Sequence, residues 1–253
     1  QFLSPTFVKT NHNNKLAKIR VPLTILVCDR KKNVAGCGLV QLRETTNHDL
    51  LYRDYFYRSS TNATMRRDLK DVVSNVLKKV KVQSGDVVVD IGANDGTMLS
   101  YFPEKMTRIG VEPAKNISWN HLDPSIEMVN NYFSGNAITR TLKKRQVKIF
   151  TSCAMFYDLD DPNSFVADIA KLLASDGVWC IQLSYAVSML ENMNFYDICH
   201  EHLTYYSLKV LGNLMAKHGL YIFDATVNDV NGGSLIIFVT HSRNQRPVSA
   251  NLR

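Results

Sequence analysis

The sequence predicts an α/β fold in which a parallel sheet is covered by helices on both faces. Short apolar runs alternate with amphipathic stretches from about residue 87 onward, which is the pattern of a βαβ chain. The first run, VVVDIG, ends in an acid and a Gly-containing turn. A chain of 253 residues with 45% hydrophobic and 21% charged residues is typical of a globular protein.

The region before the first strand predicts a hairpin and one long helix. Residues 1–48 hold two apolar runs, PLTILVC and CGLVQL, around a polar loop. Residues 49–62 mix aromatic and polar side chains. Helical spacing extends from about residue 64 to residue 80. Its apolar face consists of Met65, Leu69, Val72, Val73, Val76 and Val80.

Strands and helices then alternate to the end of the chain. We expect strands at 87–91, 108–112, 126–130, 147–151, 178–183 and 234–240. We expect helices at 96–102, 114–121, 134–143, 163–174 and 208–218. The fourth of these helices has the clearest limits, because Asp161-Pro162 is a typical start and Ser175-Asp176-Gly177 a typical stop.

The turn DIGANDG after the first strand is the strongest candidate for a ligand site. Ligands of parallel sheets bind at the carboxyl ends of the strands, and Gly92 and Gly96 let a ligand approach the backbone closely. A dinucleotide site requires G-x-G-x-x-G, but Asn94 and Thr97 occupy the second and third glycine positions. The turn therefore does not fit a pyrophosphate.

A second acid favours a different nucleoside ligand. Glu112-Pro113 ends the next apolar run, where a carboxylate holds the two hydroxyl groups of a ribose. S-adenosylmethionine (SAM) has no phosphate and carries two cationic groups, so the Asp90 carboxylate suits it. The alternative is an ordinary βαβ turn without a ligand. The pattern resembles the SAM motifs of class I methyltransferases, and the expected cofactor residues are Asp90, Gly92, Asn94, Gly96, Glu112, Pro113 and Phe133.

Residues 195–207, FYDICHEHLTYYS, concentrate acid–base side chains beyond a late strand. A histidine near a carboxylate can act as a general base near neutral pH. The alternative is a solvated or core-packed polar loop. A metal site fits less well, because zinc proteases use H-E-x-x-H and this segment has His200, Glu201 and His202 in succession.

The five cysteines show no disulfide framework, which favours a reduced cytoplasm. Cys28 and Cys37 are candidate metal ligands, since Cys37-Gly38 resembles half of a zinc knuckle. Structural zinc needs four ligands, usually in two close pairs. Two buried free thiols are therefore the favoured interpretation, and Cys153 and Cys180 are expected in the core.

Composition argues against a membrane or nucleic-acid protein. No apolar run approaches the ~20 residues that span a bilayer, and QFLSPTFVKT is not a signal peptide. The net charge of +7 permits an anionic partner, but the basic residues are scattered without interleaved aromatic residues. The absence of an initiator Met suggests a fragment.

Four stretches resemble the sugar C-methyltransferases of deoxysugar pathways. They are CGLVQLRE with DYFYRSSTNATMR, DIGANDGTML with GVEP, HEHLTYYSL, and GGSL. The resemblance implies a Rossmann-like class I methyltransferase core with an N-terminal hairpin or cap region and the start of a C-terminal α/β domain. It implies a remnant of a zinc-ribbon-like domain at 1–48, a SAM domain at 49–195, and the catalytic HEH segment with a truncated C-terminal domain at 196–253.

The same resemblance implies methylation of a carbon next to the keto group of a nucleotide-linked sugar of the dTDP class. His202 is then the general base that forms an enolate, with Glu201 and His200 beside it. Tyr55 and Tyr57 would cover the reacting centre. Zinc is expected, if at all, in the full-length protein.

Two positions depart from the family pattern. Cys199 occupies a position where the family frequently has a Tyr. After the fourth strand, where many members have a His, this chain has Tyr157. An O- or N-methyltransferase acting on another small molecule is the main alternative, because such an enzyme also needs a base. A non-catalytic ligand-binding or nucleic-acid-binding domain is a third possibility, against which the two acids argue.

Overall fold

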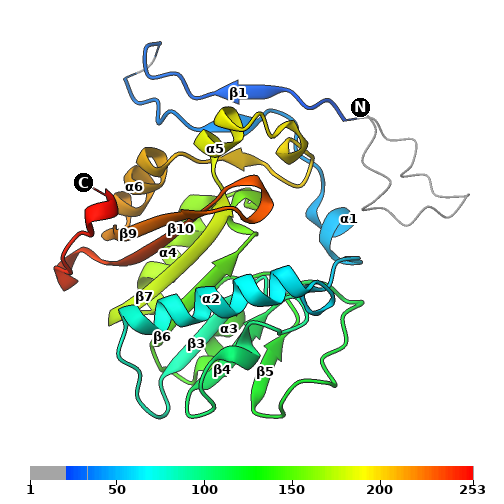
Figure 1. Ribbon diagram of the computed structural model, residues 1–253, viewed down its shortest axis with the longest axis vertical. Helices are drawn as coiled ribbons and strands as arrows, with labels where there is room; N and C mark the ends of the chain where they lie inside the picture. Colours follow the sequence, from blue (N-terminus) through cyan, green and yellow to red (C-terminus); the bar gives the residue numbers. More distant parts are fainter. Residues whose placement is uncertain (1–20, 33, 253) are drawn as a thin grey trace, which may run out of the picture.

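The structure, a computed structural model, describes residues 21–32 and 34–252 and centres on a seven-stranded sheet (Figure 1). The strand order is β5-β4-β3-β6-β7-β10-β9. The first five of these strands run parallel, and β10 is antiparallel to both neighbours. The strands are β3 (Val87–Ile91), β4 (Thr107–Val111), β5 (Ile126–Val129), β6 (Val147–Cys153), β7 (Leu173–Ser184), β9 (Leu220–Asn228) and β10 (Ser234–His241).

Helices cover both faces of this sheet, as predicted. Helix α2 (Ala63–Lys79) crosses one face, where its buried residues pack on Val88, Ile149 and Val178. The opposite face packs against three helices that share one continuous apolar core with it. These helices are α3 (Gly135–Leu142), α4 (Pro162–Leu172) and α6 (Leu208–Lys217).

Capping side chains explain where these helices begin. The side chain of Asn62 accepts hydrogen bonds from the first backbone N–H groups of α2. Asp161 caps α4 in the same way. Pro162 occupies the first helical turn, where a backbone N–H would have no intrahelical acceptor in any case. Ser134 and Ser207 cap α3 and α6.

A small three-stranded sheet lies against the end of the large one (Figure 1). The predicted hairpin forms β1 (Ile25–Val27) and β2 (Val40–Leu42), and β2 also pairs with β8 (Thr204–Tyr205). Since β8 directly follows the HEH segment, the hairpin anchors that segment. Two short helices complete the fold, α1 (His48–Tyr52) and α5 (Ala186–Glu191).

Two predicted helices differ from the structure. Residues 96–102 contain only a 3₁₀ turn over Leu99–Tyr101, and Pro103 stops any continuation. Residues 114–121 contain no helix. There the Asn116 side chain bonds both backbone groups of Tyr55, and the Trp119 indole donates to the Asn94 carbonyl oxygen, so tertiary contacts replace helical ones.

The sheet continues past residue 195, the predicted end of the SAM domain. Strand β9 was not predicted, and β10 inserts between β9 and β7 rather than extending a parallel array. Residues 220–241 therefore belong to the same sheet as the cofactor motifs. No helix among the described residues is long and apolar enough to cross a membrane.

Candidate functional site

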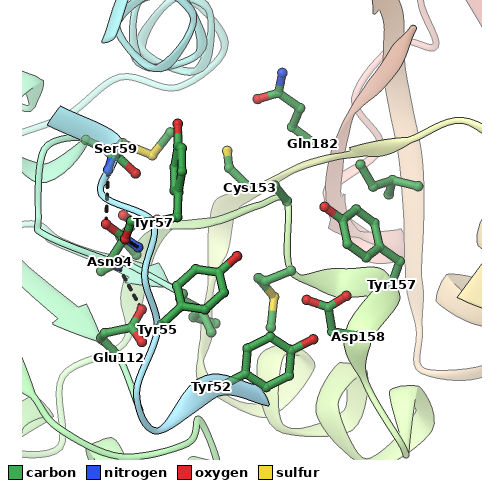
Figure 2. Close-up of a pocket in the computed structure, with 18 of the residues that line it drawn as sticks. Tyr52, Tyr55, Tyr57, Ser59, Asn94, Glu112, Cys153, Tyr157, Asp158 and Gln182 are labelled. Carbon is green, nitrogen blue, oxygen red and sulfur yellow. Dashed lines mark hydrogen bonds between the residues drawn. The ribbon is translucent and has the colours of Figure 1, made fainter. Parts of the chain in front are cut away.

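The turn after β3 is rigid because Asn94 connects it to three other segments. Asn94 adopts a left-handed conformation at φ 51°, which asparagine tolerates better than most residues. Its amide oxygen accepts from the Ser59 backbone N–H at 3.1 Å, and its amide nitrogen donates to the Tyr57 carbonyl oxygen at 3.1 Å. The turn and the aromatic segment before α2 are thereby fixed to each other (Figure 2).

Glu112 follows β4 directly and lies against the same turn. Its carboxylate accepts the Asn94 N–H at 2.8 Å and the Ala114 N–H at 2.9 Å (Figure 2). Burial raises the pKa of Glu112, and these two amide donors oppose that rise. The predicted pairing of the glycine turn with an acid at the next strand end is present.

Asp90 is the second buried acid of this region. One of its oxygens accepts from the Thr151 hydroxyl group on neighbouring β6 at 2.6 Å. Burial raises the pKa of Asp90 to about 7, the Thr151 hydrogen bond opposes the rise, and the Glu112 charge adds to it. A cationic ligand nearby would favour the ionised form.

These residues line a cavity of about 570 Å³ at the carboxyl ends of the parallel strands. This volume lies within the range of small-molecule sites, which is about 300–1,000 Å³. Five of the described lining residues are acids, and none is Lys or Arg. The acids are Asp68, Asp90, Glu112, Asp158 and Asp160.

The predicted cofactor residues are brought together with one exception. Six line the cavity, namely Asp90, Gly92, Asn94, Glu112, Pro113 and Phe133. Gly96 does not line it. Its φ is +79°, and a Cβ there would meet the Leu122 side chain at 2.5 Å, so the backbone and packing require glycine at this position.

SAM fits this cavity by its chemistry. Its sulfonium and ammonium groups match an acidic lining without competing cations, whereas a pyrophosphate would be repelled. Gly92, at φ +73°, brings bare backbone to the cavity wall, and an added Cβ would meet Met155 at 3.0 Å. Apolar and aromatic side chains such as Phe133 and Met98 complete the wall.

The aromatic segment before α2 forms one wall of the cavity. Tyr52, Tyr55, Phe56 and Tyr57 all line it. Burial raises the pKa of each of the three phenols, so they remain protonated hydrogen-bond donors near neutral pH. Figure 2 shows Tyr57 beside Asn94, Tyr55 near Glu112, and Tyr52 beside Asp158.

The HEH segment lies behind the cavity wall. None of its three residues is part of the lining. His200 bonds the Val21 carbonyl oxygen at 2.9 Å, and the Glu201 carbonyl oxygen accepts from the Tyr52 hydroxyl group at 3.2 Å. The His202 ring packs on Tyr157, with 4.2 Å between ring centroids, and Tyr157 does line the cavity.

The surroundings of His202 define its protonation state. Nδ1 lies 2.8 Å from the Asp197 carbonyl oxygen, which can only accept, so Nδ1 carries the proton and Nε2 has a free lone pair. Burial lowers the pKa of His202 to about 4, opposed by this hydrogen bond. The imidazole is therefore neutral near pH 7.

The two candidate metal ligands lie side by side on the hairpin. The Cys37 N–H donates to Cys28 Sγ at 3.2 Å, and this contact lowers the pKa of the Cys28 thiol. Both cysteines are half-buried, not buried as expected. Among residues 21–32 and 34–252 no group of three or more metal-ligating side chains assembles, so the four ligands of structural zinc are not present there.

Asp158 and Gln182 line the cavity but were not singled out from the sequence. Asp158 follows Tyr157 in a 3₁₀ turn after β6, and the run TSCAMFYDLDD placed it at a strand end, which was the available signal. Gln182 on β7 donates to Asp68 on α2 at 2.8 Å, a contact that no local pattern reveals. Cys153, expected in the core, is half-buried and lines the cavity.

Comparison with known proteins agrees with this geometry. Residues 61–224 match the model of a family described as the methyltransferase domain. The chain belongs to this family. It is 29% identical over 219 residues to the C-methyltransferase NovU of Streptomyces niveus. That alignment covers 86% of this chain and 51% of NovU, so the chain spans about half the length of this relative.

Solved methyltransferases share the fold at low sequence identity. The plantazolicin methyltransferase BamL, in complex with a triazolic desmethylPZN analogue and S-adenosylhomocysteine (SAH), has a TM-score of 0.55 and 13% identity, covering 74% of this chain and 87% of BamL. Magnesium protoporphyrin IX methyltransferase from Synechocystis PCC 6803 has a TM-score of 0.53 and 8% identity, covering 72% and 88%. Family, fold and cavity together make this chain a SAM-dependent methyltransferase domain.

Proposed function

We propose that this methyltransferase methylates a carbon next to the keto group of a nucleotide-linked deoxysugar. The similarity to a relative described as a C-methyltransferase supports carbon as the acceptor atom. The observation that carries the proposal is the state of His202. Its neutral imidazole, with a free lone pair on Nε2, lies directly behind the cavity residue Tyr157.

Carbon methylation next to a carbonyl needs two protein groups. A hydrogen on that carbon is acidic because its removal gives an enolate, so the enzyme needs a base and a donor for the enolate oxygen. His202 is the proposed base, and the cavity phenols of Tyr55 and Tyr57 cover the reacting centre. When bound, SAM supplies an electrophilic methyl group on a sulfonium that leaves as a neutral thioether.

The low pKa of His202 suits a base that acts in a buried site. A neutral imidazole is available to accept a proton across the whole neutral range. Proton transfer then creates an imidazolium beside an enolate, and this opposite charge compensates the desolvation that lowers the pKa in the free protein. Tyr157 has to move aside, or the substrate has to reach past it, for the two to meet.

The nucleotide part of the substrate is bound by other parts of the protein. A diphosphate calls for Lys or Arg, and the described cavity lining contains neither. We therefore propose that the sugar ring alone enters the cavity. The overall charge of +7 leaves basic side chains elsewhere on the chain to attract the anion.

Solvent exchange tests the enolate route. With SAH in place of SAM, a dTDP-4-keto-6-deoxyhexose should exchange one carbon-bound hydrogen with deuterated water, as followed by proton NMR. His202→Ala should reduce the rate of this exchange by about 10²–10⁴-fold, the usual rate contribution of a general base, while the affinity for SAH stays the same. Exchange at the wild-type rate in this variant would refute His202 as the base.

An O- or N-methyltransferase on another small molecule is the alternative. A hydroxyl or amine acceptor also needs a base, so loss of activity in the His202 variant does not separate the two functions. Only the enolate route requires carbon-bound hydrogen to exchange. Methyl transfer to oxygen or nitrogen without any such exchange would establish the alternative.

A further inference from the structure

The region around Asp158 combines features that the SAM site does not require. Asp158 lies in the 3₁₀ turn Phe156–Asp158 after β6 and lines the cavity. Its Oδ1 atom is buried and has no hydrogen-bond partner. Buried polar atoms are nearly always paired in folded proteins, so an orphaned one at a cavity wall indicates a missing ligand group.

Tyr52 lies beside this carboxyl group. Its hydroxyl group donates to the Glu201 carbonyl oxygen at 3.2 Å and also interacts with the Asp158 side chain. Tyr52 comes from α1 and Asp158 from the turn after β6, so the contact joins two segments far apart in the sequence (Figure 2). The Asp158 side chain is thus held in one orientation.

The surroundings of Asp158 favour its protonated form. It faces the phenols of Tyr52, Tyr55, Tyr157 and Tyr205 and the carboxylate of Glu201. Burial, strengthened by the Glu201 charge, raises the pKa of Asp158 well above its usual range, and the Tyr52 hydrogen bond only partly opposes this. A protonated carboxyl group has one O–H donor, and the unpaired Oδ1 is the oxygen that can present it to a ligand in the cavity.

We propose that Asp158 is a catalytic hydrogen-bond donor, which donates from Oδ1 to the enolate oxygen of a keto substrate while Tyr52 positions it. The inference rests on the proposed function and names the second protein group that this chemistry needs. A neutral carboxylic acid paired with a tyrosine is an established way to stabilise an enolate in an apolar site.

The proton balance distinguishes this donor from the base. The base takes the proton from the carbon, the electron pair of the C–H bond becomes the C–C double bond of the enolate, and negative charge moves to the carbonyl oxygen. Asp158 strengthens its hydrogen bond to that oxygen without losing its proton. When the new C–C bond forms, the carbonyl group returns and the proton is still on Asp158.

Two substitutions separate a donor from a base at this position. Asp158→Ala removes the hydrogen bond and should lower methyl transfer to the keto-sugar nucleotide by about 10²–10³-fold, the usual cost of losing one oxyanion donor. Asp158→Asn keeps an N–H donor of the same shape and should retain activity within about tenfold of wild type. An amide cannot accept a proton, so an Asn variant as inactive as the Ala variant would overturn the proposal.

A binding experiment tests the same group without any turnover. In the presence of SAH, 4-nitrophenol should bind to the wild-type protein as the phenolate at a pH below its solution pKa, seen as the shifted absorbance of the anion. Asp158→Ala should abolish this ionisation, and Asp158→Asn should keep part of it. Absence of binding, or binding of the neutral phenol by the wild-type protein, would also overturn the proposal.

Controls keep this result separate from folding and from the proposed function. Each variant should bind SAH with wild-type affinity in calorimetry, and Asp176→Asn, at an exposed carboxylate on β7 paired with Lys148, should match wild type throughout. Phenolate stabilisation without methylation of any keto sugar would support Asp158 as a donor and reject the substrate. Keto-sugar methylation at the wild-type rate in Asp158→Ala would support the substrate and reject Asp158 as the donor.

Discussion

At the scale of single residues, two buried carboxylates mark the proposed cofactor end of the cavity. Asp90 and Glu112 come from neighbouring parallel strands, and their oxygens are held by Thr151 and by two backbone amides. Each acid keeps further lone pairs for a ligand. Because buried carboxylates are costly to leave unpaired, we expect a cationic ligand to be stabilised there.

Removing the Asp90 carboxylate should weaken cofactor binding. A hydrogen bond to a charged group contributes roughly 1.5–3 kcal/mol, so Asp90→Ala should raise the Kd of SAM by about 10- to 100-fold. Isothermal titration calorimetry measures this directly. Asp176→Ala serves as the control, because the Asp176 carboxylate is exposed, pairs with Lys148 and does not line the cavity. An unchanged Kd would remove Asp90 from the site.

Glu112→Gln should affect stability as well as binding. Both carboxylate oxygens accept hydrogen bonds from backbone N–H groups. In a glutamine, the NH₂ group would replace one of these oxygens, and one backbone N–H would lose its acceptor. Leaving a buried amide unpaired costs about 1–3 kcal/mol. Urea unfolding without ligand should show this loss. Wild-type stability together with weaker SAM binding would mean that Glu112 contacts only the ligand.

The buried imidazole of His202 should make stability depend on pH. Its folded pKa of about 4 lies below the unfolded value near 6.5, so only the unfolded state binds this proton between the two values. Stability from this group is present above about pH 6.5 and is lost as the pH falls toward 4, by up to about 3 kcal/mol.

The comparison with His202→Gln isolates this effect from that of Asp90, whose raised pKa acts in the opposite direction. The unfolding free energy of the wild type, minus that of the variant, should decrease from pH 7.5 to pH 5, because only the wild type has a buried imidazole at this position. Urea titrations at both pH values measure it. A difference independent of pH would show that His202 is accessible to protons in the folded state.

At the scale of elements, the glycine turn and the aromatic segment act as one unit. Asn94 joins them through Ser59 and Tyr57, while Asp95 accepts a hydrogen bond from the Ser60 N–H at 2.8 Å. Residues 55–57 and 92–95 lie outside the helices and strands, so no regular structure holds the phenols of Tyr55 and Tyr57 in place. The order of the cavity wall therefore depends on these side-chain hydrogen bonds.

Asn94→Gly should keep the backbone conformation of the turn but remove the side-chain hydrogen bonds to Ser59 and Tyr57. Glycine accepts the positive φ without strain, so global stability should change by less than about 1 kcal/mol, but the links to residues 57 and 59 are lost. Hydrogen exchange should rise over residues 52–60, and SAM affinity should fall. Unchanged exchange in this segment would show that other contacts hold it.

At the scale of the whole molecule, the C-terminal strands complete the central sheet. Ile237 on β10 lies opposite Ile181 on β7 and Ala225 on β9 and is fully buried. Ile237→Ala should lower the unfolding free energy by about 2–5 kcal/mol, the usual cost of such a cavity. A single transition should appear both in circular dichroism and in the fluorescence of the buried Trp179. Two separate transitions would indicate independent domains.

Local sequence determined the cofactor end of the molecule. The turn DIGANDG and the acid at Glu112 each lie within a few residues of a strand end, and parallel strands bring their carboxyl ends to one edge. The caps Asn62 and Asp161 likewise fixed their helices from adjacent residues. Such features are predictable because the interactions that cause them are local.

Only the tertiary structure decided the rest. Periodicity could not place β10 antiparallel beside β7, because strand order depends on which apolar faces meet. It also could not tell that His202 lies behind Tyr157 or that Asp158 lies beside Tyr52, since burial and partners come from distant segments. The sequence therefore determined the cofactor, and the packing of distant segments decided which acid–base groups face it.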